Sequence, residues 1–422
     1  MNALSRRAFL AGAAGTASTA AAALAAGGLG SLLAACDSAA VNANVRSQSL
    51  VPRPYQPVTW PINAGNKPIA DGLRAEKNAT LAVYSWAGRI AAECLDKFSR
   101  RYGCQVKLTT FNSMHEAITT ITTRPTRFDV FLGAPIAMLG TLIQRSLIQP
   151  LNHSYIPNIR QAWPQFANPF YDQHWQYTVP YTIYTTGVGW RRDQVKVDPS
   201  WLYNGWKLLW RPKYNGHVAM LDDYREGIGL GLLYLDLPGL STADPLLLDA
   251  AARSLTSLAT LVHPKLSNNA ATDLAVGTTW LQQAWSGQVA AAHKNLPPGT
   301  PGDVLGYWFP ASGAGPAGSD TIAIPRSARN PVLAHLLLNF MLDTPNALAN
   351  TRGTGFMQPL NGMTATRLVR EGAVPPSLIS TVVLENTYSR GLKELALPAA
   401  ADALWQQAWQ SVVSHMQLSP IG

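Results

Sequence analysis

The sequence predicts an α/β fold made of two bodies, and two observations carry this prediction. From Thr80 onward, short apolar strands alternate with amphipathic helices, and the same alternation resumes after residues 177–181. Strands joined by helices form a parallel sheet covered by helices, with binding sites at the carboxyl ends of the strands. The chain has 422 residues, 47% of them hydrophobic and 14% charged, which is enough for two globular domains.

In the first body, strands are predicted over residues 81–85, 106–108 and 129–132. The first predicted helix buries one face and ends at a glycine, Gly103, and that face consists of Ile90, Cys94, Leu95 and Phe98. Two further helices are predicted over 114–121 and 136–143.

In the second body, strands are predicted over 187–190 and 217–221, and helices over 246–261 and 280–288. The chain then passes through a Gly-rich loop to a predicted strand over 321–325 and a helix over 332–342.

The first 36 residues have the pattern of an export signal. The pair Arg6-Arg7 forms a twin-arginine motif, and the Ala/Gly/Leu-rich run that follows ends in Leu-Ala-Ala-Cys36, as a lipobox does. We therefore expect residues 1–35 to be removed, Cys36 to be acylated, and the protein to be exported by the twin-arginine route and anchored to the outer face of the cytoplasmic membrane. The alternative is a transmembrane anchor over 8–35, which the weak hydrophobicity of the run and its small-residue end disfavour.

Residues 36–77 contain five prolines and little periodicity, so an extended tether is predicted there. The formal charge is +9, and it falls to about +7 without Arg6 and Arg7. Export and the scatter of Lys and Arg disfavour a nucleic-acid partner, and any contact with anionic headgroups would be incidental.

Apart from Cys36, the cysteines are Cys94 and Cys104. An exported location permits a disulfide between them, whereas folding in a reducing cytoplasm before export favours two buried thiols. The sequence leaves both states open.

Motifs for catalysis or metal binding are absent from the sequence. It has no G-x-S-x-G elbow and no P-loop, and the glycine run 227–231 lacks the last spacing of G-x-G-x-x-G. His115-Glu116 begins like a zinc-protease helix, but Thr119 stands where the second histidine belongs. No cofactor is expected, and a hydrolase assembled from distant residues is the minor alternative to a protein without catalytic activity.

Nine short segments occur in one fixed order along the chain. They are YSW (84–86), FDV (128–130), LIQPL (147–151), VPY (179–181), WKLLWRPKYNG (206–216), DDYRE (222–226), WSG (285–287), DTIAIP (320–325) and NFML (339–342). In this order they resemble the bacterial extracellular solute-binding proteins of ABC importers, especially the spermidine/putrescine-binding branch.

The resemblance implies a periplasmic-binding-protein-like fold, in which two α/β lobes are joined by a hinge with a ligand cleft between them. Lobe 1 would comprise residues 78–182 and 306–345, lobe 2 residues 183–305, and a C-terminal segment, 346–422, would complete the cleft and lobe 2. The implied protein is a monomer that captures a small di- or polyamine and delivers it to the permease of an ABC transporter. Another small cationic metabolite or a metal chelate is the alternative ligand.

Six residues match ligand-contact positions of the polyamine-binding pattern: Trp86, Asp223, Glu226, Trp285, Asp320 and Phe356. Aromatic faces cover methylene chains and attract cations, and carboxylates accept hydrogen bonds from ammonium groups. Each also has a structural interpretation, namely core packing for the aromatic rings, a helix cap for Asp223, a solvated first turn for Glu226 and a turn for Asp320.

Four positions depart from the pattern. Gly88 stands where polyamine binders have an acid, Gly318 where they have a second tryptophan, and Ala134 and Ile136 where they have polar or aromatic groups. We therefore expect weaker polyamine binding, or a preference for a different chain length, than in close polyamine binders.

Overall fold

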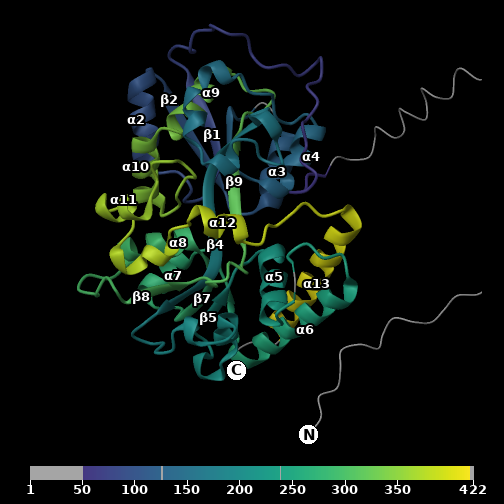
Figure 1. The fold of residues 1–422 in the computed structure, drawn as a ribbon, viewed down its shortest axis with the longest axis vertical. Helices are drawn as coiled ribbons and strands as arrows, with labels where there is room; N and C mark the ends of the chain where they lie inside the picture. The colour runs from purple at the N-terminus through teal and green to yellow at the C-terminus, as the bar shows by residue number, and fades with distance from the viewer. Residues whose placement is uncertain (1–50, 125–126, 238, 419–422) are drawn as a thin grey trace, which may run out of the picture. The chain divides into compact units, whose positions relative to one another are not determined.

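A mixed β-sheet runs through the computed structural model, which describes residues 51–124, 127–237 and 239–418 (Figure 1). The strands, in sheet order, are β2 (Gln105–Phe111), β1 (Thr80–Trp86), β3 (Val130–Pro135), β9 (Ala317–Ala323), β4 (Thr178–Arg191), β7 (Leu281–Trp285), β5 (Val218–Met220) and β6 (Lys265–Leu266), and β8 (Leu305–Trp308) pairs with β4. β1 is parallel to β2 and β3, and β5 is parallel to β6 and β7, as the strand–helix alternation predicts.

The long strand β4 joins the two halves of this sheet. Residues 178–185 pair with β9, residues 186–190 pair with β7 and residues 188–191 pair with β8, all in the antiparallel direction. The sequence predicted a separate strand at 187–190 after the segment 177–181. The structure has one continuous strand there, because nearly every residue of β4 is buried and no turn interrupts it.

The helices cover both halves of the sheet. They are α2 (Ala92–Tyr102), α3 (Met114–Thr123), α4 (Ile136–Gln144), α5 (Tyr224–Tyr234), α6 (Pro245–Val262), α7 (Ala270–Val276), α8 (Ser286–Ala292), α9 (Pro331–Met341), α10 (Thr344–Thr354), α11 (Ala365–Arg370), α12 (Glu385–Arg390) and α13 (Ala399–Leu418). Short 3₁₀ turns lie at His153–Tyr155, Pro157–Gln161, Pro164–Phe166, Gln173–Trp175, Pro199–Trp201, Gly205–Trp210, Pro212–Tyr214, His293–Asn295 and Pro376–Thr381. Gly103 ends α2 as predicted, in the left-handed conformation that favours glycine.

The helix predicted over 280–288 is wrong in its first half. Residues 281–285 form β7, which is fully buried between β4 and β5, and only the part from Ser286 is helical. Gln282 and Gln283 are buried together with the apolar residues of this short run, so its polar positions mark no solvent-facing side and periodicity does not distinguish a strand from a helix.

The cores are shared by segments far apart in sequence. One buried cluster contains Trp206, Leu255 and Leu281, and the C-terminal helix α13 adds Trp405 and Val412 to it. Among the described residues, α6 alone is long and apolar enough to cross a membrane by length and composition, and 44% of that window is buried inside the structure.

The described part of the predicted tether packs against the folded body. Val58 and Trp60 are buried, and Trp60 donates its indole N–H to Tyr171 O at 2.7 Å. Asn66 donates to Ile148 O at 2.9 Å. The segment from Val58 onward is therefore a part of the fold, although its prolines keep it free of helix and strand. Residues 1–50, which contain the predicted export signal and Cys36, lie outside the described residues.

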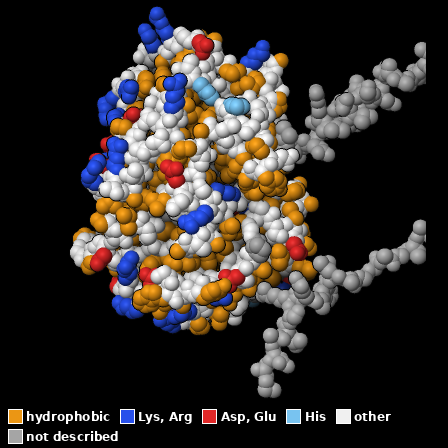
Figure 2. Space-filling view, viewed as in Figure 1, with side chains coloured by type: hydrophobic (Ala, Val, Ile, Leu, Met, Phe, Trp, Pro, Cys, Tyr) orange, Lys and Arg blue, Asp and Glu red, His pale blue; other side chains and the backbone are white. Residues whose placement is uncertain are grey.

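Lys and Arg side chains are scattered over the face of the molecule shown in Figure 2 and form no single stripe on it. This distribution is the one that the sequence predicted.

Candidate functional site

Two tryptophans face each other where two strands of the sheet end. Trp86 is the last residue of β1 and Trp285 the last residue of β7, and their ring centroids lie 6.5 Å apart with an interplanar angle of 63°. Trp86 reaches this position across Gly133, where a Cβ would come within 2.6 Å of Trp86 Cδ1. The fold thus brings together, at the carboxyl ends of strands, two rings that lie 199 residues apart.

Trp285 belongs to a cluster of rings with Tyr184 and Phe356. The Tyr184 ring centroid lies 6.2 Å from that of Trp285 and 6.3 Å from that of Phe356, in edge-to-face arrangements. Phe356 fits because Gly287 lies against its ring, where a Cβ would approach Phe356 Cδ1 to 2.4 Å. These three rings form what we call the aromatic cluster, two of whose members were predicted from the sequence.

The Tyr184 ring packs directly against Gly318, in the space that a side chain at position 318 would need. A Cβ on Gly318 would lie 2.5 Å from Tyr184 Cζ, so a larger residue at 318 and the Tyr184 ring exclude each other. A ring from the neighbouring strand β4 therefore lies beside the position at which the resemblance implied a second tryptophan.

The aromatic cluster holds the guanidinium group of Arg89. Arg89 Cζ lies 3.5 Å from the Phe356 ring centroid and 5.2 Å from the centroids of Tyr184 and Trp285. Its Nε lies 3.9 Å from Asp320 Oδ2, and both side chains are almost completely buried. Cation–π attraction and an ion pair together hold this cation inside the protein.

The backbone of Arg89 is fixed by two buried donors. Arg89 O accepts hydrogen bonds from the Tyr181 hydroxyl at 2.6 Å and from Asn350 Nδ2 at 3.3 Å. The preceding residue, Gly88, has a φ of +71°, which favours glycine. Gly88, where polyamine binders have an acid, therefore makes the turn that leads the chain from Trp86 to Arg89.

Asp320 is the buried acid that pairs with the Arg89 guanidinium. It accepts a hydrogen bond from Thr182 Oγ1 at 2.8 Å. Burial raises the pKa of Asp320, and the Arg89 charge and the Thr182 hydrogen bond partly offset that effect. The acid that the resemblance assigns to a ligand ammonium is thus paired with a cation of the protein itself.

The other two predicted acids lie at the start of α5. Asp223 caps this helix, since its Oδ1 accepts from the backbone N–H groups of Arg225 at 2.8 Å and Glu226 at 3.2 Å. Glu226 is buried rather than solvated, and its Oε1 accepts from Trp285 Nε1 at 2.7 Å and Thr186 Oγ1 at 2.8 Å. Glu226 Oε2 has no hydrogen-bond partner among the described residues.

Glu394 lies near Asp223 and Glu226 and influences the pKa of Glu226. We call these three acids the carboxyl group cluster. Burial, followed by the charge of Glu394, raises the pKa of Glu226 well above its ordinary value, although the Trp285 hydrogen bond opposes the shift. Burial also raises the pKa of Glu394 to about 7, against the lowering effect of the Arg225 charge. The cluster is therefore able to gain negative charge when a cation arrives.

Two spaces adjoin the aromatic cluster. A cavity of about 440 Å³ is bordered by the rings of Trp86, Trp285 and Phe356 and by Arg89, and its lining contains no carboxylate. A smaller cavity of about 30 Å³ is bordered by Tyr184, Glu226, Glu394 and Gly318. The larger one has the size of a small-molecule site, and the smaller one is large enough for an ammonium group or a water molecule.

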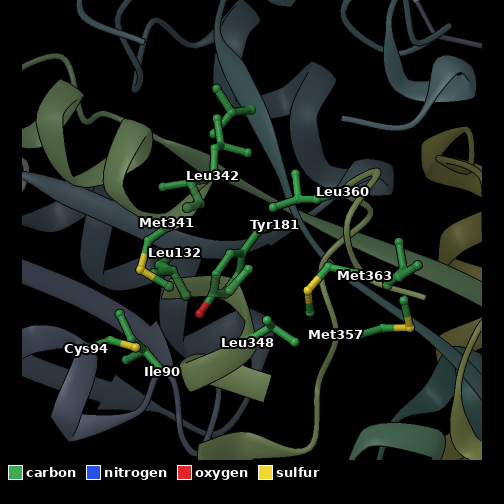
Figure 3. Packing of buried hydrophobic residues seen from close by; sticks show 14 of the residues in the cluster. Ile90, Cys94, Leu132, Tyr181, Met341, Leu342, Leu348, Met357, Leu360 and Met363 are labelled. Carbon is green, nitrogen blue, oxygen red and sulfur yellow. The ribbon is translucent and has the colours of Figure 1, made fainter. Parts of the chain in front are cut away.

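The two remaining cysteines, Cys94 and Cys104, are buried and unpaired in the structure, which favours the two buried thiols of the two states that the sequence left open. Cys94 lies beside Ile90 in the core around Tyr181 (Figure 3). Its Sγ lies 3.6 Å from Asn346 O, and burial raises its pKa to about 11.

Sequence reasoning missed Arg89, Tyr184 and Glu394 as members of the site. One signal was available for Arg89, because an arginine directly follows Gly88, the position with the missing acid. No local pattern indicates Glu394, which lies in an irregular segment and reaches Glu226 only through the tertiary fold.

Comparisons with known proteins agree with this geometry. Residues 93–372 match the model of the bacterial extracellular solute-binding protein family. The chain is similar to spermidine/putrescine-binding periplasmic protein 1 of Haemophilus influenzae, with 26% identity over 317 residues, 74% of this chain and 84% of that protein. It is also similar to the spermidine/putrescine-binding periplasmic protein of Escherichia coli, with 29% identity over 282 residues, 66% of this chain and 78% of that protein.

Solved structures are similar in fold. A spermidine/putrescine ABC transporter substrate-binding protein from Streptococcus pneumoniae has a TM-score of 0.65 and 23% identity, covering 80% of this chain and 99% of that one. A lipoprotein of Treponema pallidum has a TM-score of 0.65 and 20% identity, covering 79% and 99%. This likeness confirms the predicted two-lobe, periplasmic-binding-protein-like fold.

Proposed function

This chain belongs to the bacterial extracellular solute-binding protein family, and we propose that it is the substrate-binding protein of an ABC importer for a small di- or polyamine. Relatives that are named for spermidine and putrescine binding support this ligand class. The proposed ligand contacts are Trp86, Asp223, Glu226, Trp285 and Phe356, and the sixth residue of the pattern, Asp320, acts through its ion pair with Arg89.

The observation that carries the proposal is the position of Trp285. Its ring borders the 440 Å³ cavity, and its Nε1 donates to Glu226, a buried acid with one free oxygen. An aliphatic amine placed against this ring would bury its methylene groups on the indole face and bring its ammonium close to the carboxyl group cluster.

The proposed mechanism is closure of the two lobes on the ligand. Trp86 comes from one half of the sheet and Trp285 from the other, and β4 connects the halves. A ligand that contacts both rings binds the closed form better, and so it shifts the population toward that form. The permease would then distinguish the loaded protein by its closed shape, with no chemical change in the ligand.

The proposed location is the outer face of the cytoplasmic membrane. The twin-arginine motif and the lipobox-like end at Cys36 support export followed by acylation. Two or three acyl chains are sufficient to hold a soluble domain at a membrane surface.

Thermal-shift measurements on the full-length protein, with putrescine and spermidine, test this function. We expect at least one amine to raise the melting temperature, and small-angle scattering with that amine to show compaction. Chemical conversion of the amine would contradict the proposed role, and the absence of a shift with any small amine would contradict the proposed ligand class.

A further inference from the structure

The subsite around Asp320 is already filled by a cation of the protein. The Arg89 guanidinium contacts the aromatic cluster, at 3.5 to 5.2 Å from the three ring centroids, and pairs with Asp320. A ligand ammonium at Asp320 would have to displace it. Such displacement leaves a buried guanidinium without its carboxylate, and buried charges that lose their partner are strongly destabilising.

Arg89 is also anchored at its backbone. Its carbonyl oxygen accepts hydrogen bonds from Tyr181 and Asn350, and Asn350 Oδ1 accepts from the backbone N–H of Ala91 at 2.8 Å. The turn at Gly88 and the start of α2 are thereby held together. The backbone of Arg89 is therefore held in place, and its side chain lies at the wall of the 440 Å³ cavity.

The Arg89 side chain has one unsatisfied hydrogen-bond donor. Its Nη1 is buried and has no partner among the described residues, and Arg89 borders the 440 Å³ cavity. The residues that line this cavity include amides, such as Asn112 and Gln288, but no carboxylate. A buried charged donor is satisfied by an oxygen acceptor, and a carboxylate or carbonyl oxygen fits this requirement.

The Trp285 indole also adjoins a second unpaired polar atom. Glu226 Oε2 is a buried carboxyl oxygen without a partner among the described residues, and the Trp285 indole is bonded to the other oxygen of the same carboxyl group. Arg89 Cζ lies 5.2 Å from the Trp285 ring. One indole is therefore adjoined by an acid with an unpaired carboxyl oxygen, which can ionise beside an ammonium group, and by an arginine with an unpaired N–H, which requires an acceptor.

We propose that Arg89 determines ligand specificity by converting one ammonium subsite of the cleft into an oxygen-binding subsite. The ligand then places a carboxylate or amide carbonyl oxygen at Arg89, and the single ammonium group at its other end lies against the indole of Trp285, whose Nε1 is bonded to Glu226 of the carboxyl group cluster. ω-Amino acids and singly N-acylated diamines share this chemistry. The proposal rests on the proposed role as an importer's substrate-binding protein for an amine, and it replaces the di- or polyamine ligand with an amine that carries one ammonium group.

Calorimetric titration of the full-length protein with three ligands tests this specificity. Putrescine has two ammonium groups and 4-aminobutyrate, of the same length, has one ammonium and a carboxylate, whereas N-acetylputrescine has one ammonium and a carbonyl and is longer by the acetyl group. We expect one or both of the last two to bind at least about tenfold more tightly than putrescine, since one charge-assisted hydrogen bond has that effect. Preference between them identifies the acceptor as carbonyl or carboxylate.

Two variants test whether the preference for an oxygen-bearing ligand over putrescine depends on Arg89. Arg89→Gln removes the charge, and we expect it to reduce or reverse the preference over putrescine by about tenfold or more. Arg89→Lys retains a cation, and we expect it to keep part of the preference for 4-aminobutyrate. Arg253→Gln, at an exposed arginine on α6, is the matched control and should leave all three affinities unchanged.

The outcomes separate the two proposals. Putrescine binding as tight as that of the other two ligands to the wild-type protein would overturn the role of Arg89 and leave the proposed function intact. That comparison needs no variant, so a fold defect in Arg89→Gln does not affect it. An unchanged preference in a folded Arg89→Gln protein would also overturn the role of Arg89. No binding of any of the three would overturn the amine function and this inference with it.

Discussion

The indole nitrogen of Trp285 donates a hydrogen bond to Glu226 Oε1 at 2.7 Å, and this bond joins the wall of the larger cavity to the carboxyl group cluster behind it. A ligand that contacts the indole is therefore electrostatically linked to Glu226, whose pKa is raised well above its ordinary value, and to Glu394, whose pKa burial raises to about 7. Several expectations depend on this link.

Amine binding should release protons. The raised pKa of Glu226, and that of Glu394 at about 7, mean that the unliganded cluster retains protons that an incoming ammonium displaces. The amine itself stays charged, so its affinity should rise as pH increases from about 5 to 8. Calorimetry at pH 6.5 in two buffers of different ionisation enthalpy measures the released protons.

Glu226→Gln should weaken amine binding by about tenfold to a hundredfold and reduce the proton release, because the amide is neutral. Glu93→Gln, at an exposed acid on α2, serves as the control. Proton uptake on binding, or unchanged affinity in Glu226→Gln, would contradict the assignment of the ammonium to this cluster.

Gly318→Ala should destabilise the protein by about 1 to 3 kcal/mol, because the new methyl group collides with the Tyr184 ring. The cost should be smaller in a Tyr184→Ala background, where the ring is absent. Chemical denaturation of the four proteins measures this coupling as a double-mutant cycle. Gly302→Ala, at a glycine with open space around it, is the control. Equal costs in both backgrounds would mean that Tyr184 does not occupy this space.

Cys94 and Cys104 should both react as thiols, but only after unfolding. Both are buried, and burial raises the pKa of each, so the reactive thiolate is scarce in the native protein. Iodoacetamide labelling without reductant, followed by mass spectrometry, should add two groups in denaturant and few or none in native buffer. Failure to label under denaturing conditions without reductant would indicate a disulfide.

Cys36→Ser should move the protein from the membrane fraction to the soluble fraction and leave its mass without acyl chains. The proposed lipid attachment depends on the Cys36 sulfur. Mass spectrometry of the membrane-extracted wild-type protein should show a chain that begins at an acylated Cys36. An unmodified Cys36 within an uncleaved chain is the contrary result.

The sequence predicted most elements of the fold because their hydrophobic periodicity is local. β1, α2 and α9 lie within a few residues of their predicted bounds. The exceptions are segments buried on all sides, β4 and β7, where alternation carries no information.

Fewer of the contacts in the site could be predicted from the sequence. The resemblance indicated Trp86 and Trp285, which the fold brings together. It did not indicate that Arg89 lies between the aromatic cluster and Asp320, because that contact joins residues 231 positions apart in the sequence. A single departure, such as Gly88 in place of an acid, shows that a contact is lost, but only the structure shows which group takes its place.

The central claim is that a small amine binds against Trp285 in the cleft. Its most direct test is calorimetric titration of wild-type, Trp285→Ala and Trp201→Ala proteins with putrescine, N-acetylputrescine and 4-aminobutyrate, where Trp201 is an exposed tryptophan outside the cleft. We predict that at least one of these amines binds the wild-type and Trp201→Ala proteins with equal affinity and binds Trp285→Ala about tenfold or more weakly. Binding that Trp285→Ala leaves unchanged, or no binding of any of them at millimolar concentration, would contradict the claim.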